Sequence, residues 1–123
     1  MRVLVAGISV WAILFAIPFA VYGSASMFLD LKPPVGPAWR FLSGIAVTKL
    51  GTALAFVALF ALSRDAWRGH WALYGAIWFL MFAASEIGDV VRMASSSSEA
   101  ILGILSEAVY APVSAFVINR VLR

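Results

Sequence analysis

The chain contains no cysteine and only one histidine, His70, among its 123 residues. The absence of cysteine excludes disulfides, thiolate nucleophiles and cysteine-based zinc or iron–sulfur sites. A haem site would depend on His70, which has no second histidine as a partner. The phosphate-binding glycine loop, the HExxH zinc helix and the GxSxG nucleophile elbow are also missing. We therefore expect a protein that uses no cofactor and no metal.

Charged residues are scarce as well. They make up 12% of the chain, whereas hydrophobic residues make up 63%, and the mean hydropathy is +0.98. Soluble domains contain about 45–50% apolar and about 25% charged residues. The composition is therefore typical of an integral membrane protein. The net charge of +3 comes from nine basic and six acidic residues that lie at segment ends, so membrane topology explains it better than nucleic-acid binding.

Four apolar segments are long enough to cross a bilayer, at about residues 3–22, 39–62, 71–92 and 100–121. At about 1.5 Å per residue, such helices match a hydrocarbon core of about 30 Å. The first segment is longer than the apolar region of a secretory signal, so we expect a retained helix. Short connections favour antiparallel neighbours. The sequence thus predicts one all-α domain over residues 1–123, an antiparallel bundle of four transmembrane helices.

The segments between these spans contain helix-breaking residues. Residues 24–38 hold three prolines and Gly36, which predicts the longest loop. Residues 64–70, RDAWRGH, are expected to form a short basic loop, and the four serines at 95–98 to interrupt the chain again. Glu99 stands where an acidic residue suits a helix N-terminus.

The distribution of basic residues predicts an orientation. By the positive-inside rule, the side with more arginine and lysine is cytoplasmic. We therefore expect both termini in the cytoplasm and place the protein in a prokaryotic plasma membrane. One side holds Arg2, Arg64, Arg68, Arg120 and Arg123, and the other holds Lys32, Arg40 and Arg92.

Three ionisable residues lie well inside the predicted spans: Lys49, Glu86 and Glu107. Each charge costs roughly 2.5–3.5 kcal/mol at a helix centre. Counted along each helix, all three residues lie on the non-cytoplasmic side of their span's midpoint. They are therefore expected in one layer of the membrane. Asp89 and Arg92 continue this layer toward water.

This layer permits two interpretations. A pair of Lys49 with Glu86 or with Glu107 could serve only to hold helices together. One lysine does not neutralise three carboxylates, however, so we expect the excess carboxyl group to be protonated or in contact with water. A carboxyl group held neutral by burial is a potential general acid. Arg40 lies at the end of a predicted span, and a position at the membrane–water interface is enough to explain its charge.

The main hypothesis is an enzyme that isomerises, cyclises or opens the epoxide of a lipophilic, isoprenoid-like substrate by general acid catalysis. Glu86 or Glu107 would be the acid, Asp89 the partner base or water-orienting group, and Tyr110 a hydrogen-bond donor. Lys49 completes this set of candidate catalytic residues. Aromatic walls would bind the substrate and stabilise a cation, although helix packing is the simpler role for the residues of the first span. These candidate walls are Trp11, Phe15, Tyr22, Trp78 and Phe82.

Two alternatives belong to other classes. A proton- or cation-coupled transporter or channel subunit would work as a homodimer, since intramembrane carboxylates commonly mark ion paths. An accessory or assembly subunit would dock a partner helix on the small residues Gly44, Thr48, Gly51 and Ala55. All three hypotheses expect membrane lipid as surroundings, and the enzyme hypothesis adds a lipophilic small molecule as ligand.

Overall fold

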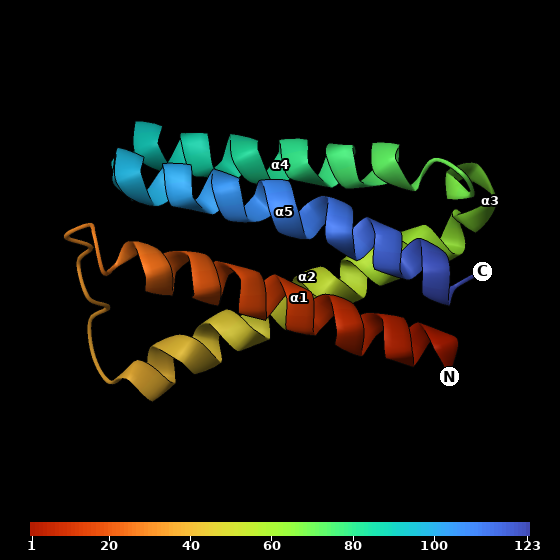
Figure 1. Ribbon diagram of the computed structural model, residues 1–123, viewed down its shortest axis with the longest axis horizontal. Helices are drawn as coiled ribbons and strands as arrows, with labels where there is room; N and C mark the ends of the chain where they lie inside the picture. Colours follow the sequence, from red (N-terminus) through yellow and green to blue (C-terminus); the bar gives the residue numbers. More distant parts are fainter.

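The computed structural model describes the whole chain and is built from helices, without strands. Four of these helices are long and apolar enough to cross a membrane, which confirms the predicted all-helical class and the four spans. The helices in chain order are α1 (Arg2–Ala25), α2 (Ala38–Leu62), α3 (Arg64–Trp67), α4 (Trp71–Val91) and α5 (Ser97–Val121) (Figure 1).

The start of α5 differs from the prediction. The Ser96 hydroxyl accepts a hydrogen bond from the Glu99 amide at 3.2 Å, and the Ser96 amide donates to the Glu99 carboxylate at 3.0 Å. This capping box satisfies two free amides and lets the helix begin at Ser97. The predicted break at the four serines is therefore wrong for its second half, while the predicted role of Glu99 at the helix N-terminus is confirmed.

The predicted basic loop at residues 64–70 is also partly wrong, because it contains the single turn α3. Trp67 of this turn packs against Tyr74 of α4, with ring centroids 5.1 Å apart. The chain then reverses at Gly69, whose φ of +83° is costly for any residue with a Cβ. Packing of Trp67 accounts for order in a segment that composition alone marks as a loop.

Helix α5 is the central helix. Eleven of its residues are buried, against three in α1, four in α2 and three in α4. It lies between α1 and α4, and α1 packs in turn on α2 (Figure 1). The Arg2 side chain donates to the Arg123 carbonyl, and the Tyr22 hydroxyl donates to the Glu99 carbonyl at 3.0 Å. The start of α1 thus meets the end of α5, and the end of α1 meets the start of α5.

Helices α4 and α5 approach each other closely at Gly75. A Cβ added there would lie 3.1 Å from Cα of Pro112 and 3.2 Å from the Ala111 carbonyl oxygen. Absence of a side chain at Gly75 therefore lets the backbones of α4 and α5 come together, as small residues do at membrane helix contacts. Pro112 does not end α5, which continues to Val121.

Four large side chains, which we call the aromatic core, fill the end of the molecule that holds both chain termini: Phe56, Phe60, Tyr74 and Trp78. The Phe56 ring lies 4.9 Å from the Tyr74 ring and 5.0 Å from the Trp78 ring, and the Tyr74 hydroxyl donates to the Phe56 carbonyl. These contacts join the second half of α2 to α4. The first half of α2 runs away from α4 and α5 (Figure 1).

Candidate functional site

Glu107 is the only acidic or basic residue of the chain that is buried, with 5% of its surface exposed. It lies on the inner face of α5, between Ser106 and the buried Tyr110. Its Oε2 atom is buried and has no hydrogen-bond partner. An unsatisfied buried carboxyl oxygen costs roughly 1–3 kcal/mol or more, so it is uncommon unless a ligand or a proton uses it.

Glu86 of α4 brings a second carboxyl group to the same place. This group lies against Gly103 of α5: a Cβ added at Gly103 would sit 2.6 Å from the Glu86 carboxyl carbon. The carboxyl groups of Glu86 and Glu107 are neighbours across the contact between α4 and α5. Glycine at position 103 therefore makes the room in which two acids meet.

Lys49 of α2 points toward these acids but forms an ion pair with neither of them. Its ammonium group donates to the Tyr110 hydroxyl at 3.4 Å and lies 4.9 Å from the centre of that ring. The only ion pair of the structure is between Arg92 and Asp89. Lys49 thus contacts the phenol, and the expected direct pair with Glu86 or Glu107 is not formed. We call Lys49, Glu86, Glu107 and Tyr110 the polar cluster.

Asp89 lies at the edge of this cluster. Its carboxylate pairs with Arg92 near the end of α4, where the side chains are 35% and 73% exposed. Asp89 therefore forms its ion pair with Arg92 at the end of the same helix. It does not contact Glu107 or Tyr110.

The three predicted wall residues of α1, Trp11, Phe15 and Tyr22, form a stripe along the helix but lie in three different surroundings. The Trp11 indole donates to the Ala46 carbonyl at 2.9 Å and so joins α1 to α2. Phe15 stacks on Phe19 of the same helix, with centroids 6.2 Å apart. Tyr22 bonds to the first turn of α5, as described above. Trp11 and Tyr22 therefore fasten helices together, which is the simpler role considered for this stripe.

The other two predicted wall residues lie next to the polar cluster. Phe82 stands edge-on to the Tyr110 ring at 5.5 Å, and Trp78 lies 5.5 Å from Phe82. Through Trp78 these rings continue into the aromatic core. Phe56 and Tyr74 were not among the predicted site residues. Their spacing to Phe60 and Trp78, four residues in each case, is the sequence signal for such a shared face.

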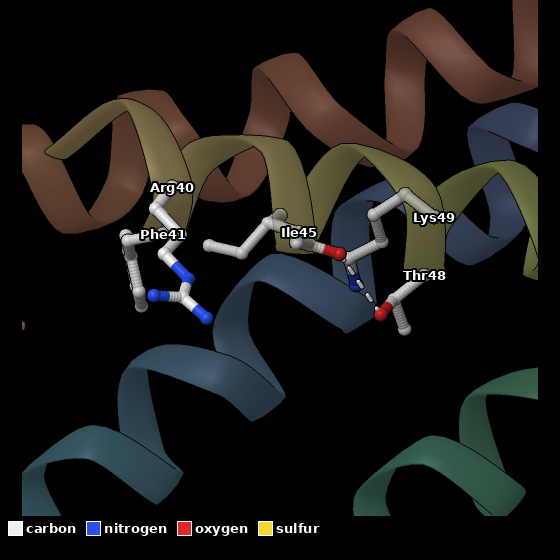
Figure 2. A pocket seen from close by; sticks show the side chains of 6 residues that line it. Arg40, Phe41, Ile45, Thr48 and Lys49 are labelled. Atoms are coloured by element: carbon white, nitrogen blue, oxygen red, sulfur yellow. Dashed lines mark hydrogen bonds between the residues drawn. The ribbon is translucent and has the colours of Figure 1, made fainter. Parts of the chain in front are cut away.

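A groove of about 380 Å³ opens along the first half of α2 (Figure 2). Figure 2 shows the side chains of Arg40 and Lys49 extending from α2 at opposite ends of the groove. Lys49 connects the groove to Tyr110 and the two acids. The sequence did not indicate this groove, whose lining residues all belong to α2. The lining residues are Arg40, Phe41, Gly44, Ile45, Thr48 and Lys49.

No group of three or more histidine, cysteine or carboxylate side chains lies close enough together to hold a metal ion. Comparison of the chain with protein families, with curated proteins and with solved structures gives no match. The function must therefore be argued from the polar cluster and the groove.

Proposed function

We propose that this protein is a membrane-embedded enzyme that isomerises, cyclises or opens the epoxide of a lipophilic, isoprenoid-like molecule. One observation carries the proposal: the buried Oε2 of Glu107, which accepts from no amide, hydroxyl or amine donor, lies beside a second carboxyl group, close to the lysine that lines an open groove. A site of this kind combines a carboxyl group shielded from water with access for a ligand.

Each residue of the polar cluster has a role in this reaction. Glu107 donates a proton to an alkene carbon or an epoxide oxygen, and the cation so formed faces the ring of Phe82. Loss of a proton from the neighbouring carbon, to the Glu107 carboxylate or to Glu86, gives the rearranged alkene. Addition of water and loss of its proton instead gives the opened epoxide. Tyr110, held by Lys49, positions the polar group of the substrate.

We place these helices as an antiparallel bundle with both termini on the cytoplasmic face of a prokaryotic plasma membrane. Support comes from the crossed end contacts of α1 and α5, which require opposite directions. Arginines gathered at the end that holds the termini support the orientation through the positive-inside rule. The polar cluster then lies in the outer half of the bilayer.

Two observations bear on the other hypotheses. The aromatic core buries Phe56, Phe60 and Tyr74 between the polar cluster and the end that holds the termini, which disfavours a transport path within one chain. The small-residue face of α2 is uncovered, since nothing lies within 4 Å of a Cβ added at Gly44 or Gly51. This open face favours the accessory-subunit or homodimer hypothesis as the second candidate.

An isotope experiment tests the enzyme without a known substrate. The full chain in lipid nanodiscs is incubated with prenyl alkenes and their epoxides in D₂O or in H₂¹⁸O, and the recovered lipids are analysed by mass spectrometry. Protonation of an alkene followed by deprotonation introduces deuterium, and epoxide opening introduces ¹⁸O. We expect label above background with the wild type and a loss of about 10²–10⁴-fold with Glu107→Gln.

Glu99→Gln is the matched control. It makes the same chemical change on the same helix, and glutamine also serves in a capping box. Label that persists in Glu107→Gln at the wild-type rate, with folded protein in both variants, would contradict the proposal. Stable dimers in nanodiscs that Gly51→Leu dissociates, with no label from any lipid, would support the second candidate.

A further inference from the structure

The groove along α2 carries two cationic side chains and no acidic one among its lining residues. Arg40 and Lys49 lie nine positions apart, which separates their Cα atoms by about 13 Å along the axis and places them at the two edges of the helix surface that lines the groove. Neither takes part in an ion pair. Lys49 has the two carboxyl groups of the polar cluster nearby, whereas Arg40 has no compensating anion in the structure.

The two cations lie at different depths. Arg40 belongs to the first turn of α2, directly after the loop that ends at Pro37 and therefore near the membrane surface. Lys49 lies at the level of the polar cluster. Between them the groove is lined by Phe41, Ile45 and two small residues. The Thr48 hydroxyl is occupied by its own helix, since it donates to the Gly44 carbonyl at 3.1 Å.

The lining residues follow the same order as the parts of an amphiphile. A charged residue lies near the membrane surface, apolar residues follow, and a second polar residue lies deeper. The volume of about 380 Å³ is within the range of ligand sites, roughly 300–1,000 Å³. An unpaired guanidinium favours a carboxylate or phosphate, which it can hold through two parallel hydrogen bonds. A neutral head group would leave the charge of Arg40 without a counter-charge at the surface end of the groove.

We propose that the groove binds a single-chain amphiphile with an anionic head group, a carboxylate or a phosphate monoester. Arg40 holds the head group, the hydrocarbon chain lies over Phe41, Gly44 and Ile45, and a polar or unsaturated group further along the chain reaches Lys49 and Tyr110. This inference rests on the proposed function, for which it specifies the substrate class as anionic lipids.

A binding measurement tests this inference separately from catalysis. The full chain in nanodiscs of phosphatidylcholine is titrated with radiolabelled dodecanoate, dodecyl phosphate and dodecanol. We expect saturable binding of at least one of the two anions and binding about tenfold weaker for the alcohol, because the alcohol forms no charge-assisted hydrogen bond with Arg40. The preferred anion identifies the head group.

Arg40→Gln is expected to weaken binding of the anion about tenfold. Arg92→Gln removes the same charge at the same end of the molecule but outside the groove, and we expect it to bind as the wild type does. Thermal unfolding of both variants checks that they are folded. Equal loss in both variants, or equal binding of the alcohol and the anions, would overturn the inference. So would displacement of the anions by bilayer phosphatidylglycerol, since the occupant would then be a two-chain membrane lipid.

The two proposals fail in different ways. Glu107→Gln is expected to keep the anion affinity of the wild type while losing isotope incorporation. Arg40-dependent anion binding without isotope incorporation in any lipid would refute the catalytic proposal and retain an anion-binding groove. Isotope incorporation that Arg40→Gln leaves unchanged at low substrate concentration would refute the anionic substrate and retain the catalyst.

Discussion

The aromatic core and the polar cluster occupy neighbouring levels of the same spans, the core nearer the chain termini and the cluster from mid-span outward, and they differ in almost every physical respect. In the aromatic core, α2 packs on α4 through rings, and Phe56, Phe60 and Tyr74 are buried. Around the polar cluster, α2 has moved away from α4 and α5, a groove is open, and a buried carboxyl oxygen has no partner.

Under the proposed function, this difference separates the residues that stabilise the protein from those that act on the ligand, at different levels of the spans. In lipid, helices associate mainly through van der Waals packing, which the aromatic core supplies. Buried, unpartnered polar groups oppose association, and they persist where a ligand or reaction uses them. The tightly packed end therefore holds the helices at fixed positions while the other end keeps room for a ligand. Four predictions test this separation.

The largest effect is expected in the aromatic core. Phe56→Ala removes a fully buried ring and should destabilise the protein by about 3–5 kcal/mol. Phe41→Ala, the matched change on the same helix, removes a ring that is 47% exposed and should cost less than about 1 kcal/mol. Reversible unfolding in detergent micelles measures both. Equal losses would mean that the groove end contributes to packing as much as the core does.

Two glycines provide the next test. Gly75→Ala should destabilise by about 1–2 kcal/mol, because its Cβ meets the α5 backbone at 3.1–3.2 Å and overpacking outweighs the gain in helix propensity. Gly103→Ala should leave stability within about 0.5 kcal/mol, because the flexible Glu86 side chain moves aside. The same Gly103→Ala variant should lose isotope incorporation. A larger loss of stability in Gly103→Ala than in Gly75→Ala would contradict the view that Gly75 serves helix packing and Gly103 makes room for the two acids.

A smaller effect with the opposite sign is expected at Glu107. Glu107→Met replaces an unsatisfied carboxyl group by an apolar side chain and should stabilise the protein by about 1 kcal/mol while abolishing label incorporation. Leu105→Met, on the exposed side of the same helix, is the control and should change stability little. A clear loss of stability in Glu107→Met would favour the structural interpretation, in which the acid holds helices together.

The smallest effect is expected at the exposed ion pair. Asp89→Asn removes the partner of Arg92, but a surface pair in an i,i+3 position contributes only about 0–0.5 kcal/mol. We also expect wild-type isotope incorporation, because the carboxylate is engaged outside the polar cluster. A large drop in turnover with unchanged stability would restore Asp89 as the partner base that the sequence suggested.

Much of the fold follows from local properties of the sequence. The four spans are visible as apolar runs, and Glu99 is placed correctly at a helix start because a capping box is a contact between residues three apart. The short helix α3 was not predicted, since its order comes from Trp67 packing on a residue of another helix. The direct Lys49–carboxylate pair was expected from depth alone, whereas the position of Lys49 depends on the angle at which α2 crosses the other helices.

The sequence alone determined that this chain is a membrane protein of four helices with ionisable groups near one level, because hydropathy, span length and residue counts depend only on the order of residues. Tertiary structure decided which of those groups meet. The approach of α4 and α5 at Gly75 brings Glu86 and Glu107 together over Gly103, and the first half of α2 leaves a groove open between Arg40 and Lys49. Helix crossing depends on the fit of many side chains at once, and no single segment encodes it.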